Sequence, residues 1–88
     1  MAELLLGEEH PEYADSMSNL AFVLHDQGEY DEAENLYLRA LEIRQAGLGS
    51  DHPFVGQSFN NLSFLYYDKG QIDTALDYSR RAVANYRQ

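Results

Sequence analysis

The sequence predicts an all-α superhelix, a solenoid made of two helical hairpins and therefore of four helices. Residues 6–46 realign without a gap on residues 48–88, a period of 42 residues, and 14 of the 41 aligned pairs are identical. Apolar residues recur at helical spacing in both copies, and no segment alternates as a strand does. A fixed period of this length indicates stacked helical units that bury one continuous core.

The first copy opens with a helix expected over residues 11–27. Pro11 fits the first helical position, because its missing N–H costs nothing there and its φ is already helical. Gly28 ends the helix, as a residue able to adopt positive φ often does. Apolar side chains between them predict one buried stripe: Tyr13, Met17, Leu20, Ala21 and Leu24.

A second helix is expected over residues 30–46. Asp31 stands near its start, where its carboxylate can cap free backbone amides. The segment Gly47-Leu48-Gly49 is expected to separate the two copies. The buried stripe of this helix is Ala33, Leu36, Tyr37, Ala40 and Leu41.

The second copy repeats these signals and predicts helices over residues 53–69 and 72–87. Pro53 begins the third helix, Gly70 ends it, and Asp73 is placed to cap the fourth. The apolar positions are Val55, Phe59, Leu62 and Tyr66, followed by Ala75, Leu76, Ala82, Val83 and Tyr86.

Composition limits the classes of function. Residues 1–88 make one small domain, with repeats at about 6–47 and 48–88, and the absence of Cys excludes disulfides, thiolate catalysis and Cys-based metal sites. No apolar run reaches the roughly 18 residues of a membrane span, and no signal peptide pattern opens the chain. We therefore expect a cytoplasmic protein with no membrane partner.

The formal net charge of −9 argues against a nucleic-acid partner, which requires a basic surface. Residues 1–47 hold eleven acidic residues and two arginines, a balance of −9, whereas residues 48–88 hold four acidic and four basic residues. One interpretation is a solvated face that keeps the protein soluble. The other is that the first repeat attracts a basic segment of a partner.

The repeated residues resemble the tetratricopeptide repeat. The family's W-x2-L-G-x2-Y and A-x3-F patterns appear as Met17-x2-Leu20-Ala21-x2-Leu24 with Ala33-x3-Tyr37, and again from Phe59 onward. The chain departs from them by having no Trp, by Ser79 at the expected aromatic position, and by a 42-residue period. The LG-x-x-HP segment before the first helix of each pair is similar to the kinesin-light-chain branch of the family.

The resemblance implies that the first helix of each hairpin lines a concave groove that binds a peptide or protein. The residues expected to line it are Asp15, Asn19, Phe22, His25, Gln57, Asn60, Asn61, Phe64 and Tyr67. Asn19 and Asn61 occupy equivalent positions and could hold backbone groups about three residues apart on one peptide, given helix axes ~8–10 Å apart and ~3.3 Å per extended residue. Alternatively, the two amides bond a neighbouring helix or loop.

No Lys or Arg stands at these groove positions, which disfavours recognition of a C-terminal carboxylate and favours an internal or basic segment. His10 and His52 precede prolines at helix starts and are interpreted as capping or packing residues. No catalytic arrangement, metal site or cofactor motif is found, so we expect no enzymatic activity.

The leading functional hypothesis is a non-catalytic scaffold or adaptor module that binds a peptide or a partner segment. The alternative is a structural module that self-associates by stacking repeats without a peptide ligand. Residues 2–6 correspond to the end of a preceding repeat's second helix, and no polar capping helix follows Gln88. Tyr66, Val83 and Tyr86 are therefore expected to leave apolar surface uncovered.

Overall fold

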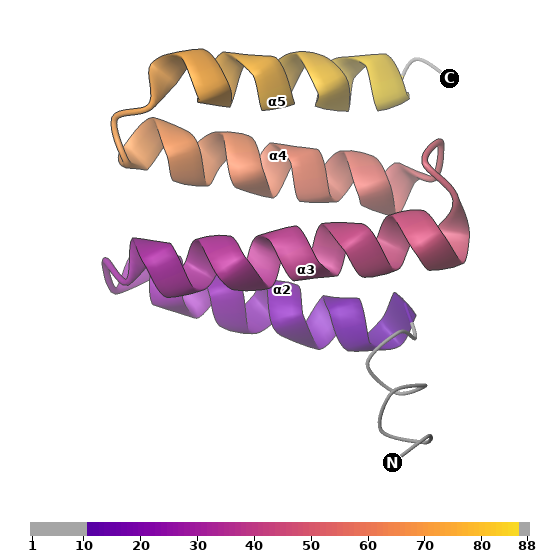
Figure 1. Ribbon diagram of the computed structural model, residues 1–88, viewed down its shortest axis with the longest axis horizontal. Coiled ribbons are helices and arrows are strands. Elements are labelled where there is room, and N and C mark those ends of the chain that lie inside the picture. The colour runs from indigo at the N-terminus through magenta and orange to yellow at the C-terminus, as the bar shows by residue number, and fades with distance from the viewer. Residues whose placement is uncertain (1–10, 87–88) are drawn as a thin grey trace.

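The computed structural model describes residues 11–86, which form four α-helices (Figure 1). They are α2 (Pro11–Asp26), α3 (Tyr30–Leu48), α4 (Pro53–Asp68) and α5 (Ile72–Tyr86). The predicted all-α hairpin solenoid is confirmed, and no strand occurs within these residues. The proposed helix stub at residues 2–6 lies outside the described part of the chain.

The helices stack in chain order and alternate in direction (Figure 1). α2 packs against α3, α3 against α4, and α4 against α5, so that the second helix of one hairpin meets the first helix of the next. No helix within residues 11–86 is both long and apolar enough to cross a membrane.

The chain turns at the predicted glycines. Gly28 and Gly70 adopt φ values of 86° and 84°, which only glycine reaches without strain, and they end α2 and α4 as expected. The separation of the repeats differs from the prediction, because Gly47 and Leu48 still belong to α3 and the turn begins at Gly49 with φ 91°.

The caps are only partly as predicted. The His52 side chain caps α4, since its Nδ1 accepts a hydrogen bond from the Phe54 backbone N–H at 3.1 Å. Asp31 does not cap α3, because Glu29 occupies the N-cap position and makes no side-chain cap bond. Asp31 instead lies in the first turn, where the helix dipole favours a carboxylate, and it accepts a bond from Lys69.

The core runs through the three helix contacts. Small residues lie where helices approach closely, and Ala33, Ala40, Ala75 and Ala82 are all buried as expected. Tyr37, Val55 and Leu62 fill the contact between the two repeats.

Several predicted core residues are exposed. Tyr13 and Leu20 on α2, and Leu76 and Val83 on α5, are about half exposed, because each of these helices has a described neighbour on one side only. Val83 is uncovered as expected, whereas the expectation that Tyr66 would also be uncovered is wrong. Tyr66 is buried, and its ring stacks on the Tyr78 ring with the ring centres 5.5 Å apart. Its hydroxyl donates a hydrogen bond to the Glu34 carboxylate. The Tyr86 side chain lies outside the described residues.

Candidate functional site

A depression of about 450 Å³ lies between α2 and α4 with α3 as its floor, and we call it the groove pocket. Its lining residues are Asp15, Ser18, Asn19 and Phe22 from α2, Tyr37 and Arg44 from α3, and Phe54, Gln57 and Asn61 from α4. Five of the nine residues expected from the sequence therefore come together in one place: Asp15, Asn19, Phe22, Gln57 and Asn61.

Helical spacing and the repeat together explain this convergence. Asp15, Asn19 and Phe22 stand at i, i+4 and i+7 and share one face of α2. Gln57 and Asn61 occupy the equivalent positions on α4, 42 residues later. Since the two helices are equivalent members of stacked hairpins, the same face of each one opens onto the same side.

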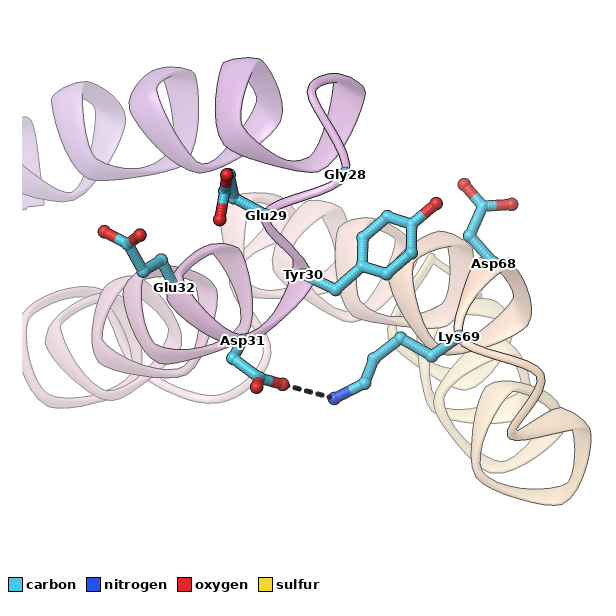
Figure 2. A pocket seen from close by; sticks show the side chains of 7 residues that line it. All are labelled: Gly28, Glu29, Tyr30, Asp31, Glu32, Asp68 and Lys69. Carbon is cyan, nitrogen blue, oxygen red and sulfur yellow. Dashed lines mark hydrogen bonds and ion pairs between the residues drawn. The ribbon is translucent and has the colours of Figure 1, made fainter.

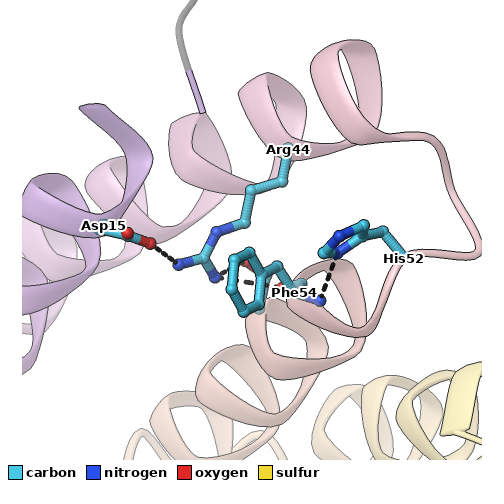
Figure 3. A network of polar contacts seen from close by, with 5 residues as sticks. Asp15, Arg44, His52 and Phe54 are labelled. Atoms are coloured by element: carbon cyan, nitrogen blue, oxygen red, sulfur yellow. Dashed lines mark hydrogen bonds and ion pairs between the residues drawn. The ribbon is translucent and has the colours of Figure 1, made fainter. Parts of the chain in front are cut away.

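Arg44 is a central residue of the pocket that the sequence reasoning missed. Its side chain is 2% exposed and lies between the two walls (Figure 3). Its Nη1 donates to the Phe54 carbonyl at 3.1 Å and to the Ser58 hydroxyl at 2.8 Å, while Nη2 donates to the Asp15 carboxylate at 2.8 Å. Arg44 therefore ties α2 to α4 and sets the spacing of the groove walls.

A signal for Arg44 was present in the sequence. The stripe of α3 that contains Tyr37 and Leu41 continues, at helical spacing, to Arg44. A charged residue on such a stripe is seldom buried unless it is paired. Its burial indicates partners on the neighbouring helices, and here they are Asp15, Ser58 and Phe54.

The groove pocket holds one basic residue outside the positions expected from the sequence, because Arg44 of α3 lines it. Its positive charge is matched by Asp15, whose side chain is 57% exposed at the rim. The guanidinium also lies over the Phe54 ring, 5.6 Å from the ring centre. The buried Nε of Arg44 and the buried hydroxyl of Ser18 have no hydrogen-bond partner among the described residues.

His25 does not lie open on the groove surface, which corrects the expectation from the sequence. It is 4% exposed, and its Nε2 lies 2.6 Å from the Asp68 carboxylate of α4. The imidazole also packs at 4.9 Å from the Phe64 ring and 5.6 Å from the Tyr30 ring. His25 is therefore a second link between α2 and α4 rather than an open surface group.

The other three expected residues all belong to α4. Phe64 and Tyr67 are exposed, and Asn60 is exposed as well. None of the three lines the groove pocket. Of the three side chains, Phe64 reaches the opposite wall of the groove, where its ring packs against His25 of α2.

A second depression, of about 420 Å³, lies where α2 ends, α3 begins and α4 ends (Figure 2). Its lining residues are Gly28, Glu29, Tyr30, Asp31, Glu32, Asp68 and Lys69, and we call it the acidic pocket. The lining thus holds four carboxylates and one ammonium group. The Lys69 Nζ already donates to Asp31 at 3.3 Å and to Glu34 at 2.7 Å.

The Lys69 cluster perturbs the groups around it. The hydrogen bond from Lys69, with a second from Tyr66, lowers the pKa of Glu34 below its ordinary value. The bond to Glu34 in turn raises the pKa of Lys69. Burial, followed by the bond to Glu34, raises the pKa of the Tyr66 hydroxyl, so Tyr66 remains protonated and donates.

Two stacked helical hairpins with a groove between their first helices define a helical-repeat protein. The tetratricopeptide repeat family model matches residues 1–46 and 12–88, and the chain belongs to the tetratricopeptide repeat family. Members of this family generally mediate protein–protein interactions and are typically non-catalytic scaffolds. No curated protein matches the sequence.

Proposed function

We propose that this chain is a non-catalytic adaptor that binds an extended segment of a partner protein in the groove pocket. The observation that carries the proposal is the convergence of Asn19 and Asn61, equivalent residues one repeat apart, on one depression. The 42-residue period further suggests a module of the kinesin-light-chain-like type.

The free amides support a binding role over a scaffold role. Among the described residues, neither the Asn19 nor the Asn61 side chain forms a hydrogen bond, whereas Asn85 binds the carbonyls of Ser50 and His52. An Asn amide with a purely structural role would be hydrogen-bonded within the protein, as the Asn85 amide is. A primary amide both donates and accepts, so an unpaired one can bind a peptide group without reading the side chain beside it.

The groove walls are held in place before any partner arrives. Arg44 bonds to Asp15 of one wall and to Phe54 and Ser58 of the other, and His25 bonds to Asp68. Binding to such a preorganised groove avoids much of the ordering cost that weakens association. Phe22 and Phe54 add apolar contact area beside the amides.

Charge favours a basic segment as the ligand. The acidic pocket carries four carboxylates against Lys69, and residues 1–47 carry a net charge of −9. Arg44 does not offset this charge for a ligand, because it is buried and bonded to Asp15. A free C-terminal carboxylate would find no unpaired cation among the residues that line either pocket.

The experiment is a peptide array with basic, neutral and acidic sequences, followed by fluorescence anisotropy on the best binder. We expect basic sequences to bind best, and their affinity to fall as salt is raised. The double substitution Asn19→Leu with Asn61→Leu should weaken binding at least tenfold. Asn35→Leu, an exposed amide on α3 outside both pockets, is the matched control.

Two results would overturn the proposal. One is unchanged affinity in the Asn19→Leu, Asn61→Leu variant for every peptide that the wild-type protein binds. The other is equal loss in the Asn35→Leu control, which would assign the effect to general destabilisation. Circular dichroism of each variant separates loss of binding from loss of fold.

A further inference from the structure

α2 exposes an apolar face at positions that are fully buried in the second repeat. The exposed side chains are Tyr13, Leu20 and Val23, at 42%, 52% and 49%, and their equivalents on α4 are Val55, Leu62 and Leu65, each 0% exposed. The equivalents on α4 are covered because α3 packs against them. α2 therefore presents a surface shaped to receive a helix like α3.

α5 presents the complementary surface. Leu76 and Val83 are 50% and 52% exposed, and they border a depression of about 340 Å³. The depression is lined by Leu76, Ser79, Arg80, Val83 and Ala84. Positions 76, 79, 80 and 83 stand at i, i+3, i+4 and i+7, which is the set of four that forms a hole for a knob from a facing helix.

The contact of α3 with α4 shows how such surfaces fit together. It runs antiparallel, with Glu34 bonded to Tyr66 near one end and Arg44 bonded to Ser58 near the other. Between these bonds, Leu62 shares a buried cluster with Tyr37 and Leu41. One repeat further along, residues 37 and 41 correspond to Ser79 and Val83, and one repeat back, Leu62 corresponds to Leu20.

We propose that a second copy of this chain covers these faces, with α2 of one copy packed antiparallel on α5 of the next. In the register of α3 on α4, Leu20 enters the depression beside Val83. Leu76 meets Leu24, because these residues stand where the internal contact has Glu34 and Tyr66. The stacking joins the two outer helices of the repeat pair (Figure 1) and leaves the groove pocket free.

Charge selects this head-to-tail pairing over a pairing of two α2 faces. The first repeat carries −9 and the second is neutral, so a head-to-tail contact places an acidic repeat on a neutral one. Two α2 faces would oppose two acidic repeats. A head-to-tail contact uses two different surfaces and does not close on itself, so it predicts open chains that lengthen with protein concentration.

Sedimentation equilibrium of the full 88-residue chain tests the proposal. The weight-average mass should rise continuously as the protein is concentrated toward the millimolar range. Leu20→Glu and Val83→Glu should each be monomeric alone, because each lacks one of the two faces. An equimolar mixture of the two variants should form a dimer and nothing larger, since one intact α2 face then meets one intact α5 face.

Ala46→Glu places the same charge on an exposed position of α3, outside both faces, and should associate like the wild-type protein. A wild-type chain that stays monomeric throughout the concentration series would overturn the proposal. So would dimers of Val83→Glu alone, which would show pairing of α2 faces, or dimers of Leu20→Glu alone, which would show pairing of α5 faces. If a variant loses helicity, the single variants Tyr13→Glu and Leu76→Glu replace it, one on each of the same two faces.

Discussion

Arg44 donates a hydrogen bond to the Asp15 carboxylate at 2.8 Å while its own side chain is 2% exposed. This one residue of α3 contacts both walls of the groove, because its other bonds reach the Phe54 carbonyl and the Ser58 hydroxyl of α4. The groove is therefore built around a buried cation whose charge is matched at the rim.

Arg44→Met should lower the free energy of unfolding by roughly 2 kcal/mol, because the Ser58 hydroxyl and the Phe54 carbonyl lose a charged donor. Asp15→Asn should lower the free energy of unfolding by less than about 1 kcal/mol, since Asp15 is more than half exposed and its ion pair is screened by water. Urea denaturation measures both values. Arg81→Met, which removes an exposed i,i+4 ion pair with Asp77, is the control. Equal stability of the Arg44→Met and Arg81→Met variants would contradict the structural role of Arg44.

Leu62→Ala and Leu20→Ala remove the same side chain from equivalent positions of the two repeats. Leu62 is completely buried between α3 and α4, so its truncation should cost about 2–5 kcal/mol. Leu20 is about half exposed on the monomer, and its truncation should cost roughly 0.5 kcal/mol in dilute solution. Thermal unfolding at low protein concentration measures the difference. Similar melting temperatures for the two variants would show that a further element covers α2 as α3 covers α4.

Stability should fall with acid through the Glu34 carboxylate. Its pKa in the folded state lies below its ordinary value of 4.5, chiefly because Lys69 donates to it. A lowered pKa stabilises the fold at pH values above the ordinary pKa, and this stabilisation is lost as the pH falls through the folded-state pKa. Glu34→Gln should therefore destabilise the protein by roughly 1 kcal/mol at pH 7 and by much less at strongly acidic pH. Urea titrations at a series of pH values check this, and a gap that stays constant with pH would refute it.

Gly70→Ala and Gly47→Ala should change stability in opposite directions. Gly70 adopts φ 84°, where a Cβ is strained, so its replacement should cost about 1 kcal/mol or slightly more. Gly47 lies exposed within α3, where Ala should add roughly 0.5–1 kcal/mol of stability through helix propensity. Differential scanning calorimetry of the two variants measures the signs. Destabilisation by Gly47→Ala would contradict the helical assignment at that position.

The starts and ends of the helices could be predicted from the sequence, because they depend on signals within one turn of the chain. Pro11 and Pro53 begin helices, and Gly28 and Gly70 end them, because the backbone chemistry of each residue acts within one turn. Gly47 was misjudged because a glycine also fits inside a helix, and α3 continues through Gly47 to Leu48 before the turn at Gly49. Asp31 was misjudged as a cap because its partner, Lys69, stands 38 residues away.

The candidate site, too, could be predicted only where it depends on spacing along the chain. The equivalence of Asn19 with Asn61 is visible from the repeat alone, and the structure brings both into one pocket. The burial of His25 could not be read from its helix, because it depends on Asp68 of another hairpin. Arg44 was missed for a related reason, since its partners lie 29, 14 and 10 residues away along the chain.

The sequence by itself determined the period, the four helices and the face of each first helix that bears polar residues, because these depend on spacing along one chain. Only the tertiary structure decided which apolar stripes are covered, which charged groups are buried, and that Arg44 links the two groove walls. The physical reason is that burial is a property of neighbours: Leu20 and Leu62 are the same residue at the same repeat position, and the helix packed beside Leu62 makes the difference.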